Sequence, residues 1–210
     1  TTMTSSQIMA YRKKISYIWQ DSIGSLSPRM SVGSLITEAY KIHNLKDRDL
    51  KMEADRLLKL VGLPTNIKER YAHELSGGQA RRVGVARAIA LNPKLIIADE
   101  PTAGLDVSVQ GEILNLLNKL RDDLGVSLFV ITHNLNIVRH ISDRTAVMYL
   151  GRFVEQGQTD DIFAKPRHPY TLALLSANLT PYQETSLKNK IELHGEVPSL
   201  MDRPNGCEFH

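Results

Sequence analysis

Two short apolar runs, separated by one helical stretch, constrain the fold of this chain more than any other sequence feature. Residues 95–98 are continuously apolar, as expected for a strand buried on both faces, and residues 127–131 are expected to form a second buried strand. Between them, residues 109–124 have helical spacing and end at Gly125. This order predicts an α/β fold with a largely parallel sheet and flanking helices.

The alternation continues on both sides of this unit. Residues 15–19 are β-branched and aromatic and predict a strand, and the pattern from residue 31 to residue 63 predicts a helical insert. Downstream we expect a helix at residues 135–141, followed by a strand pair at 144–149 and 152–156 that turns at Gly151. Two further helices are expected, one from residue 160 and one at residues 170–177. Beyond Thr180 the chain is polar and contains several prolines, which predicts an irregular extension.

Composition excludes several classes of protein. The chain has 210 residues with a net charge of +3, which is too mild a balance to predict nucleic-acid binding. No apolar stretch reaches the length of about 18 residues that a membrane-spanning helix needs, and residues 1–6 lack the apolar core of a signal peptide. The single cysteine, Cys207, excludes an internal disulfide framework and indicates a reducing compartment.

A Leu-Ser-Gly-Gly-Gln motif opens a predicted helix at residues 75–79. Ser76 is placed as the N-cap, and Gly77 and Gly78 leave the backbone uncovered. Free N–H groups and the positive end of the helix dipole make such a start an anion site, suited to phosphate. The alternative is a flexible Gly-Gly turn with a serine cap, which the flanking Leu75 and Gln79 disfavour.

Two adjacent carboxylates, Asp99 and Glu100, follow the first apolar run directly. The carboxyl ends of buried strands are where α/β sheets place ligands. An aspartate there can hold Mg²⁺, and the following glutamate can polarise a water that attacks a phosphate. For an isolated pair, the alternative of two surface carboxylates that merely end a strand would be preferred.

In their order and spacing, residues 75–79, residues 95–101 and His133 resemble the ATPase subunit of an ABC transporter. Residues 101–106, which end in Asp106, resemble the D-loop that follows the Walker B strand in this family and contacts the opposing subunit. His133 corresponds to the switch histidine, which holds the γ-phosphate and the attacking water, although a lone histidine near a strand end is usually structural. Gln20 corresponds to the Q-loop glutamine, which reaches Mg²⁺ and couples the site to the membrane partner.

This resemblance implies a dimer with two ATP molecules at its interface, because the family's signature binds the γ-phosphate of an ATP held by the partner. The cofactors it implies are ATP and Mg²⁺, with Asp99 and Gln20 positioning the metal ion and Glu100 orienting the water. The implied partners are a second ABC ATPase subunit, identical or related, the transmembrane permease subunits and, indirectly, a substrate-binding protein, with no nucleic acid. The implied location is peripheral, on the cytoplasmic face of the plasma (inner) membrane.

The phosphate-cradling loop of the family, Gly-x-x-x-x-Gly-Lys-Ser/Thr (Walker A), does not occur in the sequence. The family places it several tens of residues before the Q-loop, and only nineteen residues precede Gln20. We expect the loop to lie on a segment outside this sequence rather than to have been lost, because Glu100, His133 and the signature all remain.

A finer resemblance points to the branch that imports oligopeptides, dipeptides and nickel. Residues 20–30 are similar to a segment of that branch, with Ser22 in place of proline and Ser27 in place of asparagine. Further similar segments lie at residues 105–110, 154–157, 166–171 and 174–175. Residues 206–210 look like the start of the branch's C-terminal cysteine motif, which in some members binds an iron–sulfur cluster. Since Cys207 is the one cysteine present, a [4Fe-4S] cluster is expected only if a longer form carries the rest of the motif.

The resemblance divides the chain into four parts. They are a partial ATPase core with the Q-loop (1–29), a helical subdomain ending in the signature (30–80), the core with Walker B, D-loop and H-loop (81–158), and a C-terminal extension (159–210). The implied function is an ATP-binding and ATP-hydrolysing subunit that powers such an importer.

Two alternatives stay open. One is a soluble ABC ATPase outside transport, which often carries two cassettes or a coiled-coil insert that this sequence lacks. The other is a catalytically silent subunit that completes a partner's ATP site, against which Glu100 and His133 argue.

Overall fold

The computed structural model describes residues 3–45, 47–177, 191, 203–204 and 206–209. The chain forms two compact units, Thr1–His133 and Asn134–His210. The boundary after His133 falls inside the predicted 81–158 part, and the four-part division of the chain remains a prediction.

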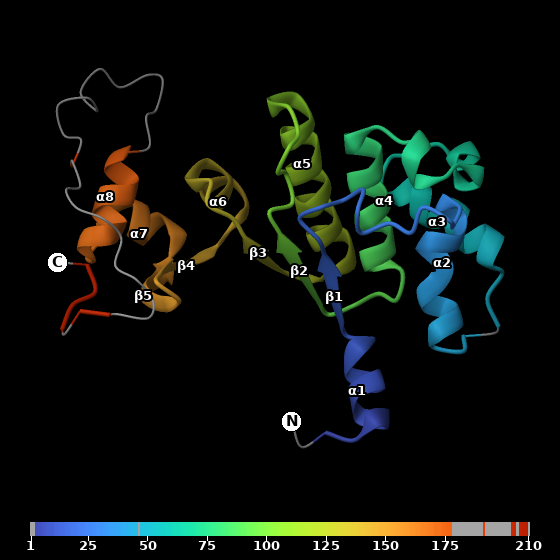
Figure 1. Cartoon of the computed structure of the whole chain (residues 1–210), viewed down its shortest axis with the longest axis horizontal. Helices are drawn as coiled ribbons and strands as arrows, with labels where there is room; N and C mark the ends of the chain where they lie inside the picture. Colours follow the sequence, from blue (N-terminus) through green and yellow to red (C-terminus); the bar gives the residue numbers. More distant parts are fainter. Residues whose placement is uncertain (1–2, 46, 178–190, 192–202, 205, 210) are drawn as a thin grey trace. The chain divides into compact units, whose positions relative to one another are not determined.

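A three-stranded parallel sheet forms the centre of the first unit (Figure 1). Its strands, in spatial order, are β1 (Ile15–Ile18), β2 (Leu95–Asp99) and β3 (Ser127–Ile131). Helix α1 (Ser5–Arg12) precedes β1, and α5 (Val107–Leu124) connects β2 to β3. The parallel α/β core is therefore confirmed, whereas α1 was missed by the sequence pattern.

The exposure of β2 and β3 corrects the expectation of two fully buried strands. In β2, Ile96 and Ala98 are buried, and the residues that alternate with them are partly exposed. β3 lies at the edge of this sheet, and its Phe129 and Ile131 are 53% and 44% exposed. The prediction of a buried second strand is wrong for this structure, because an apolar run alone does not distinguish an edge strand from a central one.

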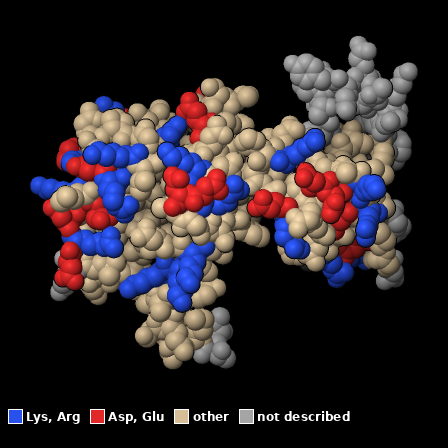
Figure 2. Space-filling model, turned by 180° about the vertical axis from the view of Figure 1, so that it is seen from behind, with Lys and Arg blue, Asp and Glu red and all other residues tan. Residues whose placement is uncertain are grey.

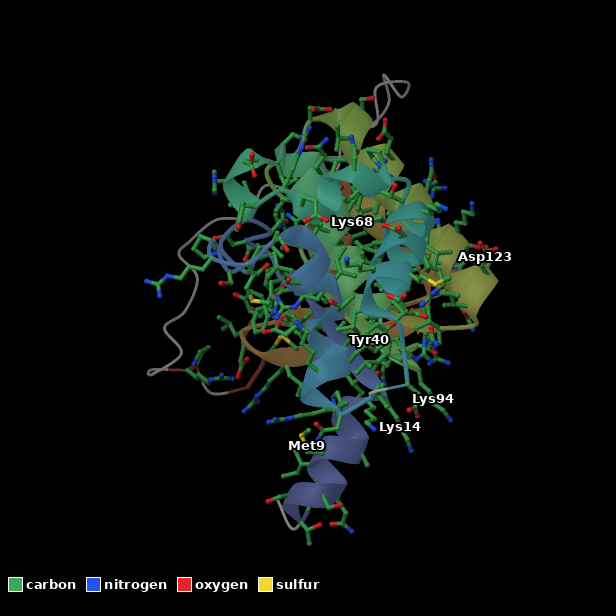
Figure 3. All side chains as sticks on the ribbon, turned by 90° about the vertical axis from the view of Figure 1, so that its right-hand side faces the viewer. Met9, Lys14, Tyr40, Lys68, Lys94 and Asp123 are labelled. Atoms are coloured by element: carbon green, nitrogen blue, oxygen red, sulfur yellow. The ribbon has the colours of Figure 1, made fainter. Side chains whose placement is uncertain are left out.

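The helical insert predicted between β1 and the signature is present as α2 (Val32–Ile42) and α3 (Leu50–Leu60). Two 3₁₀ turns that were not predicted, η1 (Thr65–Glu69) and η2 (Ala72–Glu74), follow them, and α4 (Gly77–Ile89) then begins within the signature. The buried Tyr40 of α2 ties this group together, because its hydroxyl is 2.7 Å from the Ala90 carbonyl and 2.9 Å from Glu53 Oε2 (Figure 3). Burial, followed by the hydrogen bond with Glu53, raises the pKa of Tyr40, so the hydroxyl keeps its proton.

A backbone contact aligns the amino-terminal ends of β1 and β2. Lys14 precedes β1, and its carbonyl accepts the N–H groups of Lys94 (2.8 Å) and Leu95 (3.1 Å) at the start of β2 (Figure 3).

Charged side chains of both signs are interspersed on the face of the molecule in Figure 2, in keeping with the net charge of +3.

Side-chain caps fix where the main helices begin. Ser31, Asp49, Ser76, Asp106 and Asn134 each precede a helix and accept a hydrogen bond from an N–H group of its first turn. Such caps satisfy N–H groups that have no partner within the helix. The helix start predicted at Ser76 is confirmed. It could be predicted from the sequence because a cap involves only neighbouring residues.

The second unit contains the predicted antiparallel strand pair. Its elements are α6 (Leu135–Ile141), β4 (Arg144–Tyr149), β5 (Arg152–Gln158), α7 (Thr159–Ala164) and α8 (Pro169–Ala177). The hairpin turns at Gly151, whose φ of 79° suits glycine. Glu155 of β5 accepts the N–H groups of Arg167 (2.9 Å) and His168 (3.0 Å) and so fixes the start of α8. Most of the predicted irregular extension beyond Thr180 lies outside the described residues.

Candidate functional site at the carboxyl edge of the sheet

The parallel strands end at one edge of the sheet, and the four residues predicted to be catalytic or to position magnesium lie at that edge. Gln20 follows β1, Asp99 is the last residue of β2, and Glu100 comes directly after it. His133 follows β3 by two residues. Parallel pairing in the observed register therefore brings together residues that are far apart in sequence.

Glu100 is the most connected of these residues. Its Oε1 lies 2.6 Å from His133 Nδ1 and 3.1 Å from the His133 backbone nitrogen, and its Oε2 accepts the Thr132 hydroxyl at 3.3 Å. The carboxylate is 15% exposed, whereas the His133 ring is 87% exposed. The glutamate is therefore held by the loop after β3, while the imidazole reaches into solvent beside it.

The backbone of Glu100 is also held in an uncommon conformation. Its φ of 44° lies in the left-handed region, which is energetically unfavourable for any residue other than glycine. The Glu100 N–H donates to the Ile131 carbonyl at 2.9 Å, and its carbonyl accepts from Ala103 at 3.0 Å. These bonds stabilise the sharp turn that leads from β2 into the loop before α5.

Asp99 has a partner that the sequence did not reveal. The Tyr17 hydroxyl on β1 donates to Asp99 Oδ2 at 2.7 Å. This hydrogen bond, with a smaller effect of burial, raises the pKa of Tyr17, so the phenol remains a donor to the carboxylate. The register of β1 against β2 places the two side chains together, and that register is not readable from either strand alone.

The residues at this edge fit a magnesium site that is completed by phosphate. Mg²⁺ is usually held by one or two carboxylates together with water and substrate phosphates. Asp99 supplies one partly exposed carboxylate, with Glu100 beside it. In a site of this kind the remaining oxygens come from phosphate and water. Among the described residues there is no group of three or more His, Cys, Asp or Glu side chains that could hold a metal ion.

Gln20 meets this edge through its backbone. Its carbonyl accepts a hydrogen bond from Arg81 at 3.0 Å, and the residue itself is exposed. The side chain that the sequence predicts as a magnesium contact therefore lies on the accessible side of the loop.

The start of α4 is a separate, locally built feature. Ser76 Oγ accepts the Gln79 N–H at 3.3 Å, and Gln79 Oε1 accepts the Ser76 N–H at 3.1 Å, which is a complete capping box. Ser76 and Gly77 are exposed, whereas Leu75 is 8% exposed and packs inward. The helix start is thus accessible to an anion, and Leu75 anchors it.

The glycines of this segment approach the loop before α5 and the first turn of that helix. A Cβ atom at Gly77 would lie 3.6 Å from Leu105 Cδ2, and one at Gly78 would lie 3.0 Å from Val109 Cγ1. Only a residue without a side chain fits comfortably at the second position. Asp106, predicted as a D-loop contact, uses its carboxylate to cap α5 through the Val109 N–H at 3.0 Å.

Comparison with known proteins gives consistent matches along the chain. The family described as ABC transporter matches residues 1–103, and the family described as oligopeptide/dipeptide transporter, C-terminal region, matches residues 154–210. The oligopeptide transport ATP-binding proteins OppF of Salmonella typhimurium and Escherichia coli are 46% and 45% identical, over 94% and 95% of this chain. The chain belongs to the ABC transporter ATP-binding protein family.

The matches cover a larger share of this chain than of its relatives. This chain spans 60% and 61% of the length of the two OppF proteins. It spans 66% of a Brucella ovis protein, provisionally named a peptide import ATP-binding protein, that is 42% identical over 99% of this chain. The matches therefore cover almost all of this sequence but only part of each relative.

Solved structures agree with the fold. CbiO1 of Clostridium perfringens, described as part of the ABC transporter complex cbiONQ, is similar with a TM-score of 0.69 and 33% identity, over 77% of this chain and 64% of that one. The ATP-binding cassette MJ0796, described as a dimer bound to ADP and phosphate, gives a TM-score of 0.66 and 26% identity, over 75% of this chain and 68% of that one. The ABC ATPase fold predicted from the motifs is confirmed.

Two other expectations concern membranes and iron. Within the described ranges, no helix of this ABC protein is both long and apolar enough to cross a bilayer. Cys207 is exposed and is the one cysteine of the sequence, so the residues present do not fit an iron–sulfur cluster, which needs several thiolates.

Proposed function

We propose that this chain is part of the ATP-binding and ATP-hydrolysing subunit of a membrane importer of oligopeptides or dipeptides. The observation that carries the proposal is the Glu100 network, in which the residue after the Walker B strand is joined to the switch histidine and to Thr132. The printed names of the relatives support the peptide class, and nickel stays a possible cargo because the sequence resemblance includes that branch.

The proposed chemistry uses electrostatics and positioning rather than a covalent step. ATP and Mg²⁺, when bound, supply the transferable γ-phosphoryl group and the charge that neutralises it. Glu100 orients the attacking water and accepts its proton at a carboxylate oxygen, while His133 holds the γ-phosphate side of the site. Asp99 and Gln20 position the metal ion.

The composite site requires a second subunit. In the proposal, the exposed start of α4 binds the γ-phosphate of an ATP held by the partner, through free N–H groups and the positive helix end. Asp106 and its loop face the same partner. The permease subunits would receive the movement through the helical insert and the Q-loop, with the protein on the cytoplasmic face of the membrane and a binding protein delivering the cargo.

The proposal is tested on the full-length protein assembled with its permease in lipid nanodiscs. We expect ATP hydrolysis that rises when a peptide-loaded binding protein is added. Hydrolysis that needs no permease, with no permease co-purifying, would favour the soluble ABC ATPase. A complex whose hydrolysis survives Glu100→Gln in this subunit and depends only on the partner's glutamate would favour the silent subunit.

A further inference from the structure

A buried arginine on the signature helix joins the loops that follow β1 and β2. Arg81 of α4 is 2% exposed, and its guanidinium donates three hydrogen bonds. Nη1 donates to the Trp19 carbonyl at 2.8 Å, and Nη2 donates to the carbonyls of Gln20 (3.0 Å) and Ala103 (3.1 Å). One side chain thus contacts the Q-loop backbone and the loop that begins at Glu100.

The partners of Arg81 are unusual for a buried charge. All three acceptors are neutral backbone carbonyls, and burial lowers the pKa of the guanidinium while the nearby Asp21 carboxylate partly offsets this. Its Nε has no acceptor among the described residues, and it lines a cavity of about 10 Å³ with Ser22, whose Oγ also has none there. A buried cation without a carboxylate partner is costly, so packing alone would be served better by an apolar side chain.

The planar, forked shape of the Arg81 guanidinium explains what this buried charge does. A guanidinium presents its N–H groups in a rigid plane, so several acceptors bound to it are fixed relative to one another. Two of these acceptors follow β1, and the third belongs to Ala103, whose N–H bonds to the Glu100 carbonyl at 3.0 Å. The Q-loop and the turn at Glu100 are therefore both attached to the helix that starts with the signature.

We propose that Arg81 is a positioning residue that holds the backbone of Gln20 in a fixed place relative to the Glu100 turn, so that the two loops move together with α4. The joining of the loops stands on the structure of the chain alone. Its effect on ATP turnover rests on the function proposed above, because only there does the placement of Gln20 relative to Glu100 matter for chemistry.

The chain offers a matched control on the same helix. Arg82, the next residue, donates to the Val61 carbonyl at 2.8 Å and pairs with Glu112 at 2.7 Å. Its side chain is 19% exposed, and its contacts join the helical insert to α5 rather than to the two loops. Arg82→Met therefore removes a comparable arginine without touching the proposed link.

The test is hydrogen–deuterium exchange on the full-length protein, followed in peptides that cover residues 18–24 and 101–106. Arg81→Met removes the three hydrogen bonds and keeps only an unbranched apolar side chain in place of the arginine stem, so we expect exchange to rise about tenfold in both segments. Arg81→Lys keeps the charge without the fork and should raise it by about threefold, which also serves if the Met variant does not fold. Arg82→Met should leave both segments unchanged.

A kinetic measurement separates positioning from mere support of the fold. In the assembled complex, Arg81→Lys should lower kcat by about tenfold with KM changed by less than about threefold, since misplaced groups slow the chemical step more than they weaken binding. Unchanged exchange in both Arg81 variants would overturn the inference, as would raised exchange with an unchanged kcat. A wild-type complex without ATPase activity would instead contradict the proposed function, and the exchange data would still decide whether Arg81 joins the loops.

Discussion

The carboxyl edge of the sheet and the start of α4 are the two places proposed above to meet phosphate, and they are held in different ways. At the sheet edge, Glu100 depends on contacts with Thr132 and His133, more than thirty residues away. At α4, Ser76 and Gln79 satisfy each other within a single turn. The edge is thus a product of the tertiary fold, whereas the helix start is set by local sequence. A substitution at the edge should damage chemistry, and one at the helix start should first be separated from its effect on capping.

The largest expected effect is at the sheet edge. Glu100→Gln keeps the size of the side chain and can still accept the N–H of His133, but it no longer accepts a proton from water. We expect ATP turnover by the full-length complex to fall by roughly 10²–10⁴-fold, as for the loss of a general base, with ATP binding retained. Turnover measured beside nucleotide binding checks this, and an unchanged turnover would remove Glu100 from the proposed role.

The next effect compares the two strands that support this edge. Ile96 of β2 is fully buried, so Ile96→Ala should lower the free energy of unfolding by about 2–5 kcal/mol. Phe129 of β3 is 53% exposed, and Phe129→Ala should cost under about 1 kcal/mol because little burial is lost. Chemical denaturation of the full-length protein measures both. A Phe129 variant as damaging as the Ile96 variant would mean that β3 is covered in the complete protein.

A smaller effect isolates the helix start. Aspartate caps helices as well as serine does, so Ser76→Asp should leave stability within about 0.5 kcal/mol of the wild type. Its negative charge would repel an anion at the same place, and we expect turnover to fall by roughly tenfold to a hundredfold, within the range of one lost charge-stabilising contact.

The matched control for that variant is Ser31→Asp. Ser31 caps α2 through the Ser34 N–H at 3.4 Å, in the same way as Ser76 caps α4, and nothing assigns it to phosphate. Equal losses of turnover in both variants would show that the charge acts through general repulsion. A loss at Ser76 alone supports an anion at α4.

The features that could be predicted from the sequence are the ones built locally, and those that depend on the tertiary fold were missed. The cap at Asp106 is local but was not predicted, since the helix was expected to begin near residue 109. The cap at Ser76, the strand that ends at Asp99 and the glycine turn at Gly151 are also local and were predicted correctly. The Tyr17–Asp99 hydrogen bond was not, because it needs the register between two strands eighty residues apart. The carbonyls bound by Arg81 were missed for the same reason, since a basic residue inside a helix carries no signal of what its head group meets.

The smallest effect tests whether a carboxylate bound to backbone N–H groups is functional or only structural. Glu155 in the second unit resembles Glu100 in this respect, since it accepts the N–H groups of Arg167 and His168. Burial raises its pKa, but hydrogen bonds, including these two, outweigh burial and lower the pKa below its ordinary value of 4.5. The stabilisation is therefore fully present above about pH 4.5 and is lost as the pH falls through the lower folded-state pKa.

Glu155→Gln should destabilise the full-length protein by about 1 kcal/mol at pH 7, with no change in ATP turnover once the protein is folded. The difference in stability between wild type and variant should shrink as the pH is lowered below about 4.5, because the wild-type carboxylate gains its proton as the pH falls through its lowered pKa. Thermal unfolding across this pH range measures it. A difference that is independent of pH would mean that the ionised form is not what fixes the start of α8, whereas lost turnover at pH 7 would bring Glu155 into the same functional class as Glu100.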